Sequence, residues 1–478
     1  MSLVSQAQLY WNTLRYLKPI QIYRRLWFTI PWPLSKQIPS PIALQSPVRG
    51  WHEFTHRPQS VVGPLTFTLL NETHTLDQKG DWNHPQWPKL WLYHLHYFDD
   101  LNAQGANARA AWHHALIQKW IIDNPPCQGN GWEPYPLSLR IVNWIKWSLS
   151  GQRLDPLAID SLYLQARYLN QRIEWHLLGN HLLANAKALI IAGLFFKMKE
   201  AQQWLQKGIA IYQEQIPEQI LEDGMHFERS PMYHAILLED ILDLIQFSQI
   251  YPNRLPDSLL RTLSHSVQKM LAAYRVLSHP DGELGLFNDA AFGQVARYAE
   301  LSIYAKAFDL SDTNIRLQNE VNGQETIEHL PEAGYVRMQN QKASVLLDVA
   351  PIGPDYLPGH AHADTLSFEM SLFGQRLIVN GGTSSYAPGM IRSRERSTRA
   401  HSTVEINQQD SSEVWGSFRV ARRAYPYDLS IQESPNFIEV SCCHNGYTRL
   451  APTLSHCRKW QLSGSQLTVI DDVPWKEQ

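Results

Sequence analysis

Three histidines and an aspartate lie close together in the last third of this chain. His360, His362 and Asp364 are followed by His401, among glycine, serine and threonine rather than in an apolar stripe. On an extended strand, side chains two residues apart point to the same face. Neutral imidazoles on one face bind a metal or transfer protons, because histidine is a good ligand and titrates near neutral pH. Two surface histidines ahead of a strand would give the same spacing.

A second polar group stands at the start of an apolar segment. Asn180 and His181 follow Gly179, and the segment continues with leucine, alanine and isoleucine. Asn180 is a favourable N-cap residue for the helix that this segment predicts. The free backbone N–H groups at a helix start also attract anions, so the same residues suit a bound carboxylate.

A dense polar loop, residues 223–234, precedes another apolar helix. It contains Glu228 and Arg229, and it places Tyr233 in the first turn of the helix that follows. A tyrosine in such a position is typically half-buried with its hydroxyl hydrogen-bonded. If Arg229 lies beside it, the pKa of Tyr233 falls and the phenol can work as acid and base.

Arginines are concentrated just before His401. Arg392, Arg394, Arg396 and Arg399 lie within eight residues. This density suits a carboxylated or sulfated ligand, and it equally suits a solvated basic loop. Residues 279–282 and 288–289 are typical of turns, and we predict no chemistry for them.

The elements that must position these groups fall into two parts. From about residue 86 to 310 apolar residues recur at helical spacing. Short connections between the helices predict antiparallel neighbours in a bundle, solenoid or toroid. The predicted helices are 111–123, 137–150, 159–177, 181–196, 201–216, 234–251 and 258–277. After residue 331 the period changes to two, and the predicted strands are 343–351, 365–374, 375–382, 437–444 and 465–473.

Three ranges follow from this change of period. Residues 1–85 are predicted to form an N-terminal arm with lead-in helices and a proline-rich stretch. Residues 86–330 form the helical domain, and residues 331–478 form the β domain. Because the chain stops just after a strand, we expect that a C-terminal portion of the β domain is missing.

The overall composition excludes several classes of protein. The net charge of −3 does not suggest a nucleic-acid-binding protein. No segment has the roughly 18–20 apolar residues of a transmembrane helix. The N-terminus lacks a signal-peptide h-region, so the sequence predicts a cytoplasmic protein. The four cysteines contain no C-x-x-C pair, and we expect neither a cysteine zinc site nor a disulfide framework.

Four motifs occur in the order found in one enzyme family. They are Gly-Asn-His-x-x-x-Asn from residue 179, Asp-Gly-x-x-x-Glu-Arg-Ser-x-x-Tyr-His from 223, Gly-His-Ala-His-Ala-Asp from 359 and Arg-Ser-Thr-x-x-His-Ser-Thr from 396. From about residue 85 onward the chain resembles the heparinase II/III-like polysaccharide lyases, which include heparin, heparan sulfate and alginate lyases. The resemblance implies an incomplete (α/α) toroid followed by an antiparallel β-sandwich. It also implies an acidic polysaccharide as partner, and a family that is often periplasmic.

The family's chemistry is β-elimination at a uronic acid. A base removes the C5 proton, an acid protonates the O4 leaving group, and an unsaturated uronate results. The carboxylate must be neutralised to stabilise the enolate-like state. By resemblance, Asn180 hydrogen-bonds this carboxylate and its neighbour His181 assists. Tyr233 is the acid and, for one C5 configuration, also the base, while His360 is base or carboxylate neutraliser. The residues predicted to bind substrate are Glu228, Arg229, Arg394 and Arg396.

The resemblance also implies a zinc site. His362 and His401 match two ligands, and the third is usually an aspartate shortly before a Gly-Thr-x-x-Tyr stretch. Asn380 occupies that position here, and an amide oxygen is a poorer zinc ligand than a carboxylate. We therefore expect one structural zinc at His362, Asn380 and His401, bound weakly, with hydrogen bonds in place of the metal as the alternative.

Two other functions fit parts of the pattern. A glycoside hydrolase on an (α/α) toroid needs two carboxylates flanking the scissile bond. A non-catalytic glycan-binding or exopolysaccharide-assembly protein of the same fold would bind without turnover. An unsaturated product distinguishes the lyase from both. The carboxylates that a hydrolase could use are Asp223, Glu228, Asp281 and Asp289.

Overall fold

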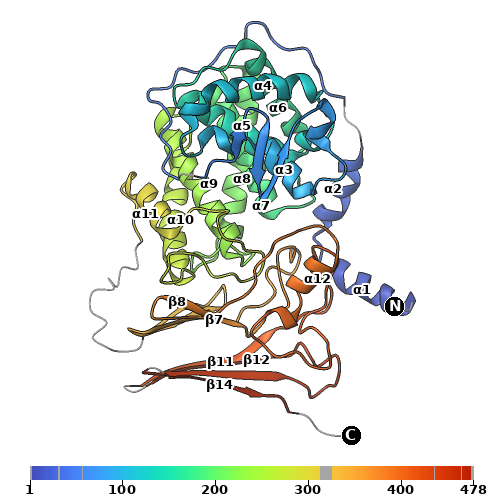
Figure 1. Cartoon of the computed structure of the whole chain (residues 1–478), viewed down its shortest axis with the longest axis vertical. Coiled ribbons are helices and arrows are strands. Elements are labelled where there is room, and N and C mark those ends of the chain that lie inside the picture. Colours follow the sequence, from blue (N-terminus) through green and yellow to red (C-terminus); the bar gives the residue numbers. More distant parts are fainter. Residues whose placement is uncertain are drawn as a thin grey trace.

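The computed structural model describes residues 3–30, 33–55, 57–312, 326–434, 437–464 and 466–474. Helices form one end of the molecule, and two antiparallel sheets are stacked at the other end (Figure 1). Residues 1–2 and 475–478, at the ends of the predicted arm and β domain, lie outside the described part.

The helical domain contains two alternating sets of helices. In the first set, α3 (Lys89–Tyr97), α5 (Pro134–Leu149), α7 (Gly179–Phe195), α9 (Pro231–Ile250) and α11 (Tyr298–Lys306) contact one another in succession. The second set is α4 (Ala110–Asp123), α6 (Pro156–Gln171), α8 (Lys199–Gln219) and α10 (Asp257–Val276). Within it, α4 contacts α6 and α8 contacts α10. This alternation confirms the predicted (α/α) toroid, and all seven predicted helices are present.

Local signals determine where these helices begin. α5, α6 and α9 each start with a proline, whose missing N–H is not needed at the first helical position. The side chains of Asp155 and Ser230 then accept the N–H groups of Ala158 and Tyr233, at 2.7 and 3.2 Å, and cap α6 and α9. α7 is apolar on all sides and is buried along nearly its whole length.

The N-terminal range has more structure than an arm. Two helices, α1 (Leu3–Leu14) and α2 (Pro19–Thr29), lie along one edge of the molecule (Figure 1). They are followed by a small antiparallel sheet of β1 (Val61–Gly63), β2 (Thr66–Leu69) and β3 (Glu72–Thr75), which the sequence analysis did not predict.

The β domain consists of two antiparallel sheets. The inner sheet has β4 (Thr326–Leu330), β5 (Tyr335–Gln339), β6 (Ala343–Asp348), β7 (Phe368–Leu372) and β8 (Gln375–Ile378) in that order. The outer sheet has β11 (Pro426–Ser434), β12 (Phe437–His444), β13 (His456–Ser463) and β14 (Gln466–Asp472). In the chain, the two sheets are separated by α12 (Met390–Glu395) and by the short strands β9 (Val414–Trp415) and β10 (Arg419–Val420). β4 pairs with β5, so the inner sheet begins five residues before the predicted boundary at 331.

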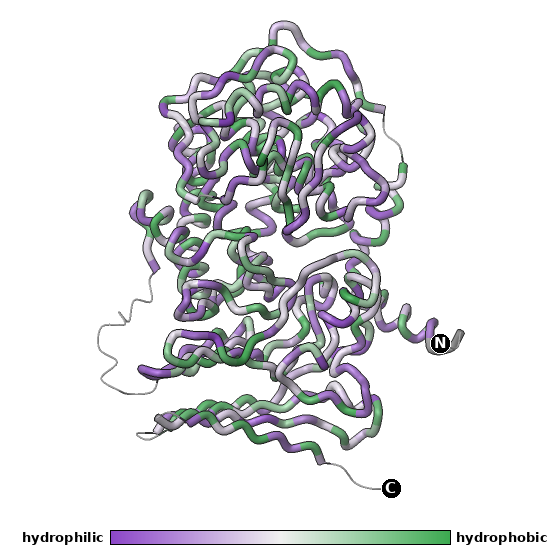
Figure 2. The backbone as a smooth tube through the Cα atoms, in the orientation of Figure 1, coloured by the Kyte–Doolittle hydropathy of each residue, from purple (hydrophilic) through white to green (hydrophobic). Residues whose placement is uncertain are grey.

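The inner sheet is covered on both faces. Val345 and Leu347 of β6 pack with Trp460 of the outer sheet, whereas Leu346 between them packs with Phe287 beside the helical domain. Every residue of β6 is therefore buried, as expected for a sheet between two layers. β13 alternates buried and partly exposed residues. Hydrophobic and hydrophilic residues are interspersed along the outer sheet (Figure 2). The turn at 331–334 and the loop that carries His360 lie against the toroid.

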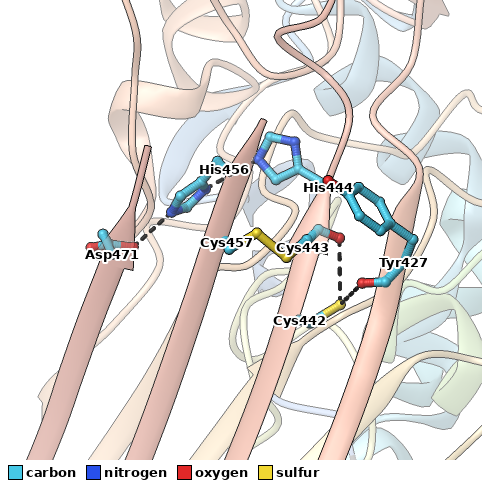
Figure 3. Close-up of a disulfide and its surroundings, with 7 residues drawn as sticks. All are labelled: Tyr427, Cys442, Cys443, His444, His456, Cys457 and Asp471. Carbon is cyan, nitrogen blue, oxygen red and sulfur yellow. Dashed lines mark hydrogen bonds and ion pairs between the residues drawn. A yellow bond between two sulfur atoms is a disulfide. The ribbon is translucent and has the colours of Figure 1, made fainter. Parts of the chain in front are cut away.

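One disulfide corrects the expectation from the cysteines. Cys443 of β12 and Cys457 of β13 lie opposite each other in the outer sheet and are bonded (Figure 3). Cys442 points to the other face, into the core between the sheets. The pairing depends on the strand register, which the sequence spacing of 14 residues does not reveal.

Candidate active site

A cavity of about 580 Å³ opens on the inner side of the toroid. α3, α5, α7 and α9 line it, which are four of the five helices of the first set. The segments 290–294 and 381–386 complete its wall from the side of the β domain. Three residues singled out in the sequence analysis meet at this wall or directly behind it: Asn180, Tyr233 and His360.

Asn180 is buried in the first turn of α7. It follows Gly179, whose φ of +54° favours glycine, and a Cβ there would lie 2.2 Å from Glu228 Oε1. The backbone N–H and side-chain Nδ2 of Asn180 both donate to the carboxylate of Glu228, at 2.9 and 3.0 Å. Glu228 is thus the anion at this helix start, and Asn180 is not the N-cap. The Oδ1 atom of Asn180 is buried without a hydrogen-bond partner among the described residues.

His360 lies in the loop between β6 and β7, not on the strand that the spacing suggested. Its Nδ1 atom donates to Asp289 Oδ2 at 2.9 Å. On the other side of the ring, Nε2 lies 3.3 Å from both Asn180 Nδ2 and Glu228 Oε2. The imidazole also stacks on the ring of Tyr233, with centroids 3.8 Å apart. These contacts fix the ring against the wall of the cavity.

Tyr233 keeps its proton at neutral pH. Burial raises the pKa of its phenol well above the usual value, and the neighbouring Tyr386 and Asp289 raise it further. Its hydroxyl lies 3.1 Å from the hydroxyl of Tyr386, which also lines the cavity. Arg229 is absent from this surrounding, so the predicted lowering of the Tyr233 pKa is wrong. The phenol is a proton donor in this environment.

A single buried carboxylate holds both motif histidines. Asp289 accepts from His360 Nδ1 through Oδ2 and from His362 Nε2 through Oδ1, each at 2.9 Å. The guanidinium of Arg392 donates to both oxygens of the same carboxylate. Burial alone would raise the pKa of Asp289, but these partners hold it well below its usual range. His360 and His362 were predicted to lie on one face of a strand. In the structure they lie in a loop and both donate to Asp289.

The predicted zinc ligands lie together behind this aspartate. His401 Nδ1 donates to Asn380 Oδ1 at 3.0 Å, and His362 Nε2 donates to Asp289. Carboxylate and amide oxygens only accept, so in the neutral rings the two remaining nitrogens both carry lone pairs. These atoms, His362 Nδ1 and His401 Nε2, face each other at 3.3 Å.

Two facing lone pairs form no hydrogen bond, and a cation suits the space between them. Two nitrogen ligands of tetrahedral zinc, bound at about 2.0–2.1 Å, lie about 3.3–3.4 Å apart. The carboxylate of Asp364 completes a group with His362 and His401 whose ligand atoms all lie within 4.8 Å of one another. Burial lowers the pKa of His401 to about 4, which keeps the ring neutral. The donor set fits a metal with Asp364 as the carboxylate and Asn380 as a partner of His401.

The other predicted residues have different places. Arg229 donates to the backbone carbonyls of Glu332 and Ala333 and so joins the two domains. Arg396 is buried, and its guanidinium donates to backbone carbonyls. Arg394 is exposed outside the cavity lining. The structure therefore does not place these three arginines as substrate ligands.

Glu228 and His181 lie beside the cavity wall. Glu228 is buried and holds Asn180 and His360 rather than facing the cavity. His181 contacts Glu174, with Nδ1 3.2 Å from its carboxylate, and packs on Tyr135. Burial lowers the pKa of His181, but Glu174 outweighs burial and leaves the pKa raised.

The four carboxylates considered for a hydrolase do not flank the cavity. Asp289 and Glu228 are buried behind its wall, and Asp281 pairs with Arg376. Asp223 accepts backbone N–H groups of residues 332 and 333. None of the four is among the residues that line the cavity.

Family comparison agrees with this architecture. The heparinase II/III N-terminus model matches residues 142–315, and the heparinase II/III-like C-terminal model matches residues 322–477. The chain belongs to the heparinase II/III-like family. Its matched relatives include a heparin-sulfate lyase of Bacteroides stercoris, 26% identical over 272 residues that cover 54% of this chain and 40% of that protein. They also include FtsZ-localized protein C of Caulobacter vibrioides, 24% identical over 388 residues that cover 78% and 62%.

Solved structures extend the fold comparison. The crystal structure of heparinase III superposes with a TM-score of 0.65 and 18% identity, and the match covers 84% of this chain and 66% of that one. At this identity the likeness concerns the fold. The matched region spans about two fifths of the Bacteroides lyase, so that relative has a large part without counterpart in the alignment.

Proposed function

We propose that this heparinase II/III-like chain cleaves a uronate-containing glycan by β-elimination. One observation carries the proposal: a phenol that keeps its proton, an oriented imidazole and a buried amide oxygen without a partner converge at one cavity wall. They belong to Tyr233, His360 and Asn180. Stacking of the first two rings at 3.8 Å brings acid and base to the same sugar.

The reaction divides between the two rings. His360 Nδ1 donates to Asp289, so Nε2 can carry the lone pair that takes the C5 proton. The electrons of the C5–H bond form the C4=C5 double bond as the C4–O4 bond breaks. Tyr233 Oη gives its proton to O4, and solvent or the protonated His360 restores it. The raised pKa of Tyr233 supports its role as acid.

Asn180 acts on the substrate carboxyl group. Its Nδ2 is held by Glu228, and its buried Oδ1 lacks a donor among the described residues. A protonated carboxyl or a hydroxyl group of the sugar would supply that donor. Hydrogen-bonded to Oδ1, the protonated carboxyl group would stay neutral, and the neutral form stabilises the enolate-like state. Glu228 is in this account a positioning residue for Asn180, whose Nδ2 in turn lies 3.3 Å from His360 Nε2.

We propose in addition one bound metal with a structural role. His362, His401 and Asp364 would hold it, and Asn380 would orient His401. The ion would fix the loop that carries His360, and no step of the elimination passes through it. Zn²⁺ suits this set of two imidazoles and one carboxylate.

The charges of the cavity support a substrate without dense sulfation. The Lys and Arg residues in its lining are Arg57, Lys146 and Lys187. Lys187 lies 2.5 Å from carboxylates of α9 on two sides, and Lys146 lies 2.7 Å from one of them. Arg57 pairs with Glu239 at 3.4 Å. A sulfate group binds best to an unpaired guanidinium or ammonium group, and these three are already paired.

A non-catalytic role is the second candidate. FtsZ-localized protein C, a protein named for another property, aligns with 78% of this chain at 24% identity. Such a role predicts glycan binding without product.

The test measures the ultraviolet absorbance of the unsaturated product with a panel of uronate glycans. The panel pairs a glucuronate–N-acetylglucosamine polymer with its N-sulfated form. We expect product from the unsulfated member and a lower rate on the sulfated one. A reducing end without the double bond would indicate a hydrolase, and binding without either product would indicate the second candidate.

A further inference from the structure

The N-terminal helices carry a charge that the rest of the chain does not. Residues 1–52 contain six Lys and Arg residues and no Asp or Glu. The remaining residues contain 36 Lys and Arg against 45 Asp and Glu, so they are net acidic. This asymmetry lies in α1, α2 and the segment after them, at one edge of the molecule (Figure 1).

The helix α2 has an apolar face directed to solvent. Ile22, Leu26 and Ile30 follow at spacings of four residues and expose 52%, 68% and 44% of their surface. The opposite face holds α2 on the protein, because Gln21 is buried and Phe28 packs on His176. The exposed apolar stripe is therefore not the side by which the helix packs.

The helix α1 repeats this arrangement. Tyr10 and Thr13 contact Trp415 of the β domain, through ring packing and a 3.1 Å hydrogen bond. Trp11 and Leu14, one position further round the helix, are 68% and 51% exposed. Both helices thus use one face to dock and present large apolar side chains on the other, and Figure 2 shows hydrophobic and hydrophilic residues interspersed along them.

Basic side chains accompany the apolar stripe of α2. On a helical wheel Arg25 borders the Ile22–Leu26–Ile30 stripe. Arg24 lies on the opposite side, and its guanidinium is 5.8 Å from the ring of Trp175. Arg15 precedes the helix and, like Arg25, is exposed. An apolar stripe with exposed arginines beside it, here Arg25 on the helix and Arg15 before it, is suited to the interface of an anionic membrane.

We propose that the outer faces of α1 and α2 bind an anionic membrane surface. The apolar residues would enter the boundary between headgroups and acyl chains, and the arginines would contact the phosphates. A second copy on this face would bring arginines together without a carboxylate to pair them. Nucleic acid would bind the basic side chains but would leave the aliphatic stripe exposed to water. No helix among the described residues is long and apolar enough to cross a membrane, so this contact would be peripheral.

Co-sedimentation of the full chain with lipid vesicles tests this surface. We expect binding to vesicles of phosphatidylcholine with phosphatidylglycerol and little binding to phosphatidylcholine alone. Leu26→Ser should weaken binding by at least about tenfold, since the leucine side chain would leave water on binding. Arg25→Gln should weaken it by about fivefold, because each arginine near the surface contributes about 1 kcal/mol.

A matched control distinguishes binding through this surface from non-specific binding of exposed apolar residues to lipid. Leu377→Ser on β8 removes an equally exposed leucine, 63% accessible, from another face and should leave binding unchanged. All variants should unfold at the wild-type temperature. The proposal is overturned by equal sedimentation with neutral and anionic vesicles, or by wild-type binding in both N-terminal variants. Self-association that Leu26→Ser abolishes, without vesicle binding, would also overturn it and assign the face to a second copy.

Discussion

Two pairs of buried histidines lie in the β domain, and their hydrogen bonds differ. His362 and His401 have their outer nitrogens held by acceptors, so lone pairs face each other at 3.3 Å. In the outer sheet the backbone N–H of residue 446 donates to His444 Nδ1, so His444 Nε2 donates to His456 Nδ1 at 3.2 Å. His456 Nε2 then donates to Asp471 at 2.6 Å (Figure 3).

The partners of the two outer ring nitrogens therefore determine whether the two inner nitrogens bond to each other or are left with lone pairs. The outer-sheet chain is closed, because every ring nitrogen has a suitable partner. The pair next to the cavity has one proton too few for such a chain and has Asp364 close by. A disulfide stands beside the closed pair, whereas a doubly bound aspartate stands beside the open one.

The two anchoring aspartates provide the largest contrast. Asp289→Asn should lower the free energy of unfolding by about 3–5 kcal/mol, because it leaves the buried Arg392 without its carboxylate. Asp471→Asn should lower it by about 1 kcal/mol or less, since the Asp471 side chain is 31% exposed. Urea unfolding of both variants measures the difference. Equal losses would show that the two anchors do not differ.

Both aspartates also predict the same sign of pH dependence. Their partners hold the pKa of each carboxyl below its value in the unfolded chain. The stability they provide is therefore present above the unfolded pKa and is lost as the pH falls toward the folded pKa. We expect Asp289→Asn to remove more of the acid-dependent loss than Asp471→Asn.

The outer sheet depends on a covalent link instead. Replacing Cys443 and Cys457 together by serine should lower the free energy of unfolding by about 3 kcal/mol, the entropy expected for a loop of this length. The rate of glycan cleavage should remain at the wild-type level, because this sheet does not line the cavity. Thermal unfolding and the product assay check the two parts. A loss of cleavage in a folded variant would show that the outer sheet contributes to the active site.

Metal binding gives the next contrast. Zn²⁺ at about 100 times its Kd should stabilise the wild type by about 2.7 kcal/mol. His401→Ala and Asp364→Asn should abolish this stabilisation, whereas His456→Ala should keep it. Metal content and the unfolding temperature with and without chelator are the measurements. Retention of the metal in Asp364→Asn would return the third ligand position to Asn380.

The smallest effect concerns the closed pair alone. Burial lowers the pKa of His444 to about 3, from a usual value of 6.5. The unfolded chain therefore binds this proton first, and stability falls as the pH decreases below 6.5. At one pH unit below that value His444→Gln should recover about 1 kcal/mol of this loss. An unchanged pH profile of stability would show that His444 is protonated in the folded chain.

Much of the fold was predictable because its signals are local. The seven helices follow from apolar spacing, and proline and capping residues mark several of their starts. The end of α6 was predicted less well, since it lies at Gln171 and not at residue 177. β4, β5, β11 and β13 were missed. β5 is buried on both faces and so lacks the alternation that identifies a strand, and the buried side of β13 includes His456 and Arg458 and so is not apolar throughout. The register that pairs Cys443 with Cys457 is likewise a property of the folded sheet.

The candidate site was predictable only in part. Asn180, Tyr233 and His360 were found through motifs, and the structure brings them together. Asp289 was taken for turn chemistry, because its partners lie about 70 to 100 residues further along the chain.

Tyr386 and Asp364 were also missed as functional residues. Tyr386 had no signal besides its Gly-Thr-x-x-Tyr context. Asp364 stood in the histidine motif itself, two residues after His362, and this proximity was the available clue. Conversely, the arginines before His401 were taken together as ligand-binding, whereas Arg392 and Arg396 serve the interior.

The proposed elimination is tested most directly by the product assay with Tyr233→Phe. Tyr447→Phe is the matched control, since it removes a buried hydroxyl next to His444 and away from the cavity. We predict unsaturated product from the wild type and from Tyr447→Phe on the same uronate glycan, and a rate lower by about 10²–10⁴ in folded Tyr233→Phe. A rate within a few fold of wild type in Tyr233→Phe would contradict its role as the acid.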